Sequence, residues 1–416
     1  MRMTVQPESR RARTGAEFVR LSRRGRARLA AARTLLGLSL CLLRPAAGRA
    51  QAVPSFADDP RVDALMREGL PLSYNLRYRP AQRVWDELVR LYPDHPAGYV
   101  HQASLLWWQA LEDRNNKALE KQFQALIKTA LDKGKERLRL EPEDKSVPAS
   151  LARACALAVR FVATIRGSYF SAVRNGMRGH EYAQAAHRLD PDSADPLVEL
   201  GAYDYYAAAL PAVIKPFAWL LGTRGNKERG IRQLLRAAGE SRYARTEAAI
   251  VLLGVYYSEE RWQDYERALE SLMKEYPLNH VLQMWAANSF IERKRWEAGA
   301  AALESAAAWI PPAEDEYAAE ARAWLNFHLA RIRFAARAWA DSLQALQRAE
   351  EAGSKNPVLL AQLYLLMGNA LDALGERKAA LAAYGKVLAL PDIENSRSRA
   401  RRYLKAAYRA GPPGRA

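Results

Sequence analysis

The chain has 416 residues, which is enough for one large core or for a long array of repeats. Most of its formal net charge of +17 lies at the two ends: residues 1–52 hold twelve Arg and two Glu, and residues 393–416 hold six Arg, one Lys and one Glu. The body between them therefore carries a net charge of only +1. A nucleic-acid-binding protein needs a basic face on its folded part, so nucleic acid is not an expected partner.

Residues 1–52 have the order of a signal peptide behind a basic leader. An Arg-rich stretch is followed by the apolar run 35–43, which is too short to span a bilayer, and then by the small residues Ala50 and Ala52. This order predicts cleavage before Val53 and export to the bacterial periplasm. Association with the outer membrane is the alternative, and peripheral contact with a membrane stays open. After cleavage Cys155 would be the only cysteine, and its apolar neighbours predict a buried, unreactive thiol.

Residues 53–196 are predicted to form degenerate helical repeats of long period. The phrase Arg-Leu-x-Pro-acid occurs three times, and its prolines, Pro93, Pro142 and Pro191, follow one another at intervals of 49 residues. Each phrase comes after a stretch with helical apolar periodicity, and a proline cannot continue a helix. A fixed period of this size indicates an array of helix pairs, here with longer helices than usual or with insertions.

Two adjacent tryptophans, Trp107 and Trp108, stand out in this part of the chain. Neighbours on a helix point about 100° apart, so the two rings cannot both fill one seam between helices. We therefore expect one of them to face a concave surface, and Trp108 is a candidate partner-binding residue.

Residues 197–240 interrupt the repeats and are predicted to be an irregular, apolar connector, because Pro211 and Pro216 prevent one continuous helix. Two interpretations stay open. The segment is either a buried plug between two blocks of repeats or part of a binding surface. In the second interpretation the partner contacts aromatic side chains and the cations at their edge, namely Tyr203, Tyr206, Trp219, Lys215 and Arg224.

Residues 241–392 carry a shorter repeat, in which Pro277 and Pro311 lie 34 residues apart. Small residues in such a repeat let two antiparallel helices approach closely, and we expect Ala380 to face Gly368 across one of these contacts. The last unit places its large, small and terminal residues at Tyr364, Met367, Gly368, Leu371, Ala380, Tyr384, Val387 and Pro391.

This pattern resembles the tetratricopeptide repeat family over residues 60–392. The resemblance implies an all-α protein, an α-solenoid of tetratricopeptide-like helix pairs whose groove accepts an extended or helical peptide. Residues 200–234 also resemble the inclusion-body clearance proteins and their relatives on the mitochondrial outer membrane, through a Leu-Gly-x-Tyr-x-Tyr-Tyr run, a Leu-Pro, a Leu-Leu-Gly and a Gly-x-x-x-Leu. That second resemblance implies no catalytic residues. Residues 393–416 are predicted to form a basic C-terminal helix and tail.

Motifs for catalysis are weak throughout the sequence. His180 and His187 are seven residues apart, whereas a zinc-binding helix needs a spacing of four. Ser271 and Lys274 spell Ser-x-x-Lys without its companion motifs, and residues 222–227 fit neither phosphate-loop pattern.

We therefore predict a non-enzymatic protein without metal or cofactor, an exported scaffold that binds a protein or peptide partner in the bacterial envelope. The alternative is a component that binds a small apolar molecule in association with a solute transporter. An exported hydrolase is the third possibility.

Overall fold

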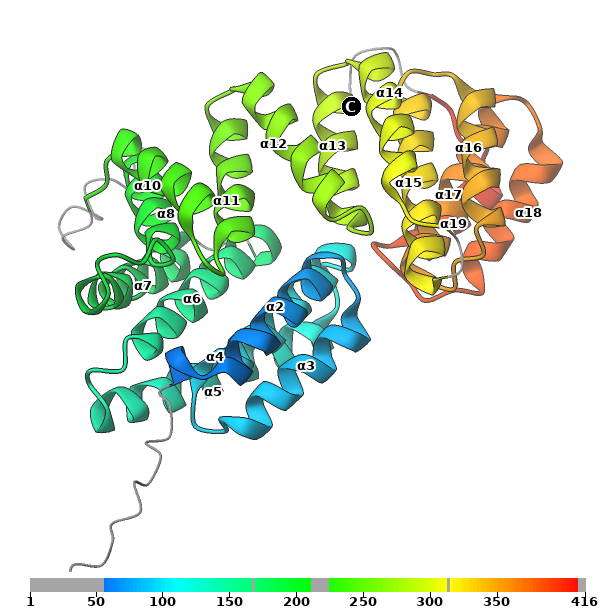
Figure 1. Ribbon diagram of the computed structural model, residues 1–416. Coiled ribbons are helices and arrows are strands. Elements are labelled where there is room, and N and C mark those ends of the chain that lie inside the picture. The colour runs from blue at the N-terminus through cyan, green and yellow to red at the C-terminus, as the bar shows by residue number, and fades with distance from the viewer. Residues whose placement is uncertain (1–55, 167–168, 211–223, 313–314, 411–416) are drawn as a thin grey trace, which may run out of the picture. The chain divides into compact units, whose positions relative to one another are not determined.

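The computed structural model describes residues 56–166, 169–210, 224–312 and 315–410. All regular structure within these ranges is helical, and they contain no strand (Figure 1). The predicted all-α class is therefore confirmed. The predicted signal peptide, together with Lys215 and Trp219 of the candidate site, lies outside the described residues.

The helices follow one another with short connections. In chain order they are η1 (Phe56–Asp58), α2 (Pro60–Tyr74), α3 (Tyr78–Leu91), α4 (Pro96–Glu112), α5 (Lys117–Leu140), α6 (Ser146–Phe161), the π-helical turn η2 (Val162–Arg166), α7 (Tyr169–Leu189), α8 (Leu197–Ala208), α10 (Lys227–Glu240), α11 (Arg245–Ser258), α12 (Trp262–Glu275), α13 (His280–Glu292), α14 (Trp296–Ala306), η3 (Ala307–Trp309), α15 (Glu316–Ala335), α16 (Trp339–Glu351), α17 (Pro357–Ala373), α18 (Arg377–Leu388) and α19 (Ser396–Lys405).

Neighbouring helices pack as pairs: α2 with α3, α4 with α5, α6 with α7, α8 with α10, α11 with α12, α13 with α14, α15 with α16, and α17 with α18. Helix α19 packs on the last pair. The three Arg-Leu-x-Pro-acid phrases stand where α3, α5 and α7 end, so each of them closes the second helix of a pair. Helices α5 and α7 have 24 and 21 residues, which accounts for the 49-residue period.

Most turns inside these pairs use one residue in the left-handed conformation. Leu76, Glu260, Lys294 and Arg337 have φ between 54° and 63°, and Gly375 has φ of 83°. The left-handed residue lets the next amide groups bond back to the open carbonyls of the helix that has just ended. Gly375 is the one glycine among these five residues.

Close approach within a pair depends on a glycine of the first helix and an aromatic ring of the second. A Cβ atom added to Gly69 would lie 2.4 Å from the Trp85 ring, and one added to Gly368 would lie 2.3 Å from the Tyr384 ring. The sequence predicted Ala380 opposite Gly368. Ala380 is fully buried, but the side chain that lies on Gly368 is Tyr384, one helical turn later.

The first helix pair is also bonded to repeats that follow about two hundred residues later. Asn279 donates from Nδ2 to the Tyr74 carbonyl (2.7 Å), and the amide of Leu278 donates to Oδ1 of Asn75 (3.2 Å). Arg77 forms an ion pair with Asp315. These contacts hold α2 and the turn after it against the start of α13 and the start of α15 (Figure 1). The repeat pattern did not predict this return of the chain.

One stretch of the described chain, Ser146–Ile165, is long and apolar enough to cross a membrane by length and composition alone. Most of it is α6, whose Leu151, Ala154 and Cys155 have no exposed surface. Burial raises the pKa of the Cys155 thiol to about 11, so the thiolate is not populated at neutral pH. The thiol is therefore buried, as predicted, and α6 has the contacts of a core helix.

Candidate functional site

The predicted aromatic site at residues 197–240 is only partly visible. Tyr203 stacks on His180 with ring centroids 3.9 Å apart, and both residues are half-buried or more. Tyr206 is 44% exposed, and Arg224 is also exposed. Of the predicted residues within the described ranges, these two are open to a partner.

The glycines of this region bring two backbones together. A Cβ atom at Gly201 would lie 2.8 Å from the carbonyl oxygen of Gly230, and one at Gly230 would lie 2.6 Å from the carbonyl oxygen of Gly201. Helices α8 and α10 therefore touch along their main chains. Arg229 adds an ion pair to the buried Asp204. The Leu-Gly-x-Tyr-x-Tyr-Tyr run thus serves helix packing. Residues 197–208 and 227–240 form a regular helix pair, so the predicted irregular connector is wrong for these described parts.

Both tryptophans of α4 are buried, and Trp108 is only 1% exposed. The ring of Trp108 lies 4.7 Å from that of Trp107 and 6.0 Å from that of Trp285 on α13. The expectation that one of the pair faces a groove is wrong for this reason: α4 is packed by α3, α5, α6 and α13. A helix covered on several sides can bury neighbours that point about 100° apart.

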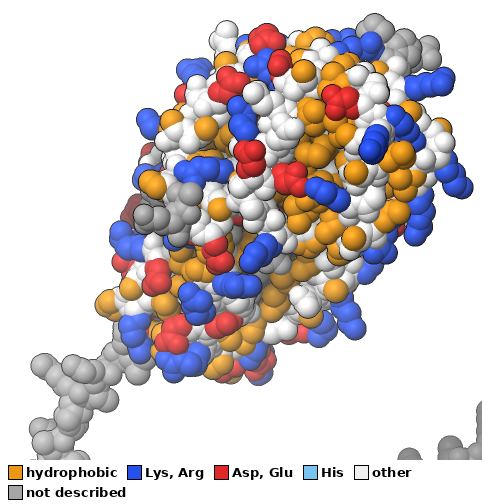
Figure 2. Space-filling model, turned by 90° about the vertical axis from the view of Figure 1, so that its right-hand side faces the viewer, with side chains coloured by type: hydrophobic (Ala, Val, Ile, Leu, Met, Phe, Trp, Pro, Cys, Tyr) orange, Lys and Arg blue, Asp and Glu red, His pale blue; other side chains and the backbone are white. Residues whose placement is uncertain are grey.

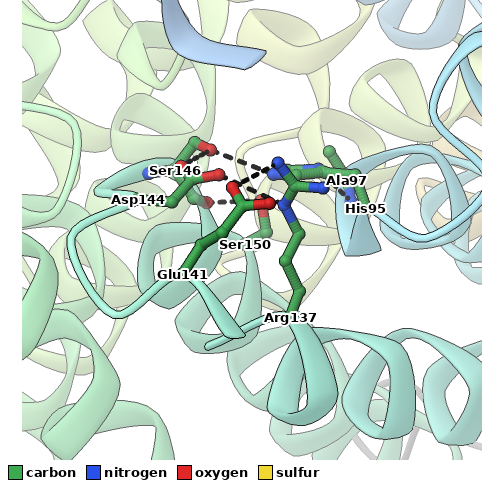
Figure 3. Close-up of polar contacts among 7 residues, drawn as sticks. All are labelled: His95, Ala97, Arg137, Glu141, Asp144, Ser146 and Ser150. Atoms are coloured by element: carbon green, nitrogen blue, oxygen red, sulfur yellow. Dashed lines mark hydrogen bonds and ion pairs between the residues drawn. The ribbon is translucent and has the colours of Figure 1, made fainter. Parts of the chain in front are cut away.

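A Ser, a His and an Asp lie together where the turn before α4 meets the turn before α6, and they test the hydrolase interpretation (Figure 3). His95 Nε2 lies 3.0 Å from Ser146 Oγ, and the Ser146 hydroxyl donates to Asp144. Arg137 contacts the same carboxylate at 3.2 Å and Glu141 at 2.8 Å.

The direction of these hydrogen bonds excludes the usual catalytic arrangement in this cluster. The amide of Ala97 donates to His95 Nδ1 (3.2 Å), so the proton of the neutral ring is on Nε2. Nε2 then donates to Ser146 Oγ and cannot accept the serine proton. In a hydrolase the histidine would stand between the other two groups and act as the base. His95 instead caps the start of α4 and ties together the turns of two successive pairs.

Acid should destabilise the protein through its buried histidines. Burial lowers the pKa of His95 and of His101 to about 3, against 6.5 for an ordinary histidine. Between these values the unfolded chain binds protons that the folded chain does not, so this stability is present above about pH 6.5 and decreases as the pH falls. At pH 5 each of these two histidines lowers the free energy of unfolding by about 2 kcal/mol relative to its value above pH 6.5. Glu199, whose pKa burial raises to about 7, acts in the opposite direction.

The variant His101→Phe tests this expectation, because phenylalanine keeps the ring that stacks on Trp85 at 4.2 Å but cannot bind a proton. The melting temperature should fall less between about pH 7.5 and pH 5 in the variant than in the unchanged protein, as measured by calorimetry. An equal fall in the two proteins would contradict the assignment.

The last repeats expose apolar side chains beside basic ones. Figure 2, drawn from the side on which α18 lies in Figure 1, shows a band of hydrophobic side chains running across this face with Lys and Arg at its edge. Leu374 after α17 and Leu381 on α18 are 38% and 37% exposed. The side chains of α19 are strongly basic, and those exposed with no carboxylate partner among the described residues are Arg399, Arg401, Arg402 and Lys405.

A cavity of about 350 Å³ opens where α4, α13, α15, α17 and α19 meet. Its wall combines aromatic and aliphatic side chains with charged ones, including Trp324 and Arg331 of α15. This volume lies in the range of small-molecule sites. None of the residues predicted from the sequence as a binding site lines it. Within the described residues, no group of three or more His, Cys, Asp or Glu could hold a metal ion.

No known family model and no curated protein match this chain. Solved structures also resemble it, among them the following three, which have low sequence identity to it. Yeast Tom70 is 10% identical, over 83% of this chain and 87% of that chain, with a TM-score of 0.36. A tetratricopeptide repeat protein from Parabacteroides merdae is 15% identical, over 73% and 99%, with a TM-score of 0.32. The P58(IPK) TPR domain is 13% identical, over 82% and 98%, with a TM-score of 0.23.

Such scores carry no argument about descent or activity. Two of the three structures are named as tetratricopeptide repeat proteins, the family that the sequence pattern resembles. The fold itself rests on the packing of this chain's own helices. The protein is an all-α array of tetratricopeptide-like helix pairs.

Proposed function

We propose that this protein is a non-enzymatic scaffold that binds a protein or peptide partner in the bacterial envelope. The observation that carries the proposal is the exposed apolar band on the face of the last repeats (Figure 2). Leu374 after α17 and Leu381 on α18 are exposed apolar side chains of the same repeat. An apolar surface of this kind, rimmed by polar side chains, marks interaction sites in soluble proteins. The helix pairs supply a rigid support on which a partner can dock without rearranging the fold.

Photocrosslinking in the native cell tests partner binding. A photoreactive amino acid at Leu381 should give a discrete crosslinked protein, because Leu381 is an exposed apolar side chain of the last repeat. The matched control is Leu140, an exposed leucine at the end of α5. Crosslinking to the same proteins from both positions, or to none from Leu381, would overturn the proposal.

Export is supported by the order of charged, apolar and small residues in 1–52. We expect N-terminal sequencing of the native protein to begin at Val53, and cell fractionation to recover the protein in the periplasm. A mature chain that begins upstream of residue 35 would contradict export through this signal.

A second candidate function is the binding of a small molecule in association with a solute transporter. The cavity between five helices favours it, since its volume and mixed lining suit a small ligand. Mass spectrometry of the native protein under non-denaturing conditions distinguishes this function, because a bound molecule would add a defined mass to the chain.

A further inference from the structure

The cavity joins parts of the chain that are far apart in sequence. Its apolar wall comes from α4, α13, α15 and α17, through Leu111, Met284, Phe327 and Leu365. Trp324 also lines the cavity, and one face of its ring is covered by the His280 ring, which stacks on it at 4.6 Å. This wall suits the apolar body of a small organic molecule.

The acid on the cavity wall already has partners. Oε1 of Glu112 accepts a hydrogen bond from the Tyr78 hydroxyl at 2.7 Å and lies 3.2 Å from His280 Nε2, and Oε2 lies 3.4 Å from Nδ2 of Asn356. Burial by itself would raise the pKa of Glu112, but His280, Tyr78 and Asn356 outweigh it and the pKa is lowered. Glu112 is therefore an ionised carboxylate that the fold itself satisfies.

The buried charge of Arg331 on α15, in contrast, has no partner of opposite charge at ion-pair distance among the described residues. Its guanidinium donates to Asn288 Oδ1 (2.7 Å) and lies 3.4 Å from His328 Nδ1, and no carboxylate of the described residues forms an ion pair with it. Burial lowers the pKa of Arg331, and the charge of Glu394 opposes this only in part. A guanidinium has five N–H donors, so Arg331 retains donors for a further acceptor.

His328 presents a second unused donor. Because Arg331 donates to Nδ1, the proton of the neutral ring is on Nε2. Nε2 is buried and has no hydrogen-bond partner in the described structure. Burial, with the charges of Arg331 and His280, lowers the pKa of His328 well below its usual value, while the backbone carbonyl of His280 raises it.

The mouth of the cavity adds more positive charge. Arg114 follows α4 and Arg399 belongs to α19, and both are exposed lining residues. Glu394 is the only other acid on the wall besides the satisfied Glu112. Three arginines thus line the cavity together with two carboxylates, and one of these, Glu112, already has hydrogen-bond partners within the fold.

We propose that this cavity binds a small organic anion, a carboxylate or a phosphate carried on a short apolar body. The anion accepts hydrogen bonds from Arg331 and from Nε2 of His328, and its body lies against Trp324 and the aliphatic wall. This proposal rests on the second candidate function and deepens it. It is independent of the docking of a partner on the exposed band, because neither Leu374 nor Leu381 lines the cavity. The ligand also contacts helices of the first and the last thirds of the chain, so its binding stabilises their junction.

Calorimetric titration of the full chain with matched probes tests the charge of the ligand. Benzoate and phenyl phosphate carry an anion on a ring, and benzamide and benzyl alcohol are neutral molecules of similar size. We expect the anions to bind at concentrations up to about 10 mM, at least tenfold more tightly than the neutral molecules, and more weakly at higher salt. The stronger of the two anions identifies the headgroup. Equal affinity of anions and neutral molecules, or no anion binding, would overturn the proposal.

Two arginine variants test the position. Arg331→Gln should weaken anion binding by about tenfold to a hundredfold, whereas Arg402→Gln, an exposed arginine of α19 outside the cavity, should leave it unchanged. If Arg331→Gln unfolds, as judged by circular dichroism, the exposed Arg399→Gln takes its place and should weaken binding several-fold. Equal affinities in the cavity variant and the control would show that the anion binds elsewhere.

Discussion

Replacing Gly368 by Val will lower the free energy of unfolding by about 3 kcal/mol. The new Cβ atom would lie 2.3 Å from Cε1 of Tyr384, whose ring has no exposed surface. The ring cannot simply swing away, because its hydroxyl donates to Asp372 at 2.9 Å and lies 3.0 Å from Oδ1 of Asn369. Either the helices of the last pair separate or these hydrogen bonds break. Urea denaturation followed by circular dichroism measures the loss.

Gly385 provides the matched control within the same helix pair. It lies in the last turn of α18, is exposed, and a Cβ atom there would meet nothing within 4 Å. The variant Gly385→Ala should therefore stabilise the protein by about 0.5–1 kcal/mol, because alanine loses less backbone freedom in a helix. If Gly368→Val proved as stable as Gly385→Ala, the close contact between Gly368 and Tyr384 would be wrong.

Replacing Glu247 by Ala will cost about 3–5 kcal/mol, because it leaves a buried cation without its partner. Glu247 of α11 forms an ion pair with Arg160 of α6, and the two side chains are 14% and 17% exposed. The Tyr74 hydroxyl of α2 donates to the same carboxylate at 3.4 Å. Burial alone would raise the pKa of Glu247, but Arg160 outweighs it and the carboxyl stays ionised. The loss is measured by chemical denaturation at neutral pH.

The exposed pair of Lys128 and Asp132 on α5 is the control for this charge effect. Its atoms lie 2.7 Å apart, but the side chains are 80% and 53% exposed. Water screens such a pair, so Asp132→Ala should leave the stability unchanged within the error of the measurement. The isosteric variant Glu247→Gln separates charge from shape. If Glu247→Ala lowered the free energy of unfolding no more than Asp132→Ala, water would have to reach the ion pair between Arg160 and Glu247.

Local sequence patterns predicted those features of the fold that depend only on neighbouring residues, namely helix ends and turns. A proline after a helical stretch ends that helix wherever the stretch lies, so the phrases at Pro93, Pro142 and Pro191 stand at the ends of α3, α5 and α7. Gly375 adopts the left-handed turn that its residue type favours. Gly368 requires a close neighbour because it lacks a side chain, although the neighbour is Tyr384 and not Ala380.

No local sequence pattern of this kind predicted the candidate binding sites. Trp108 was expected on a surface because its own helix was considered alone, whereas packing by four other helices buries it. The cavity residues Glu112, His280 and Arg331 are spread over more than two hundred positions, and none of them belongs to a motif. Whether these residues form a binding site depends on which of their hydrogen-bond donors lack acceptors, and only the packed helices show that.

The sequence by itself determined the helical class, the pairing of helices and the places where they end, because these follow from periodicity, proline and glycine within one or two turns of chain. Tertiary structure alone decided that the first pair is bonded to α13 and the start of α15, and that a cavity with unused Arg and His donors lies among five helices. The physical reason is distance along the chain. Contacts between residues two hundred positions apart depend on how the small rotations between successive pairs accumulate, and no short stretch of sequence encodes that sum.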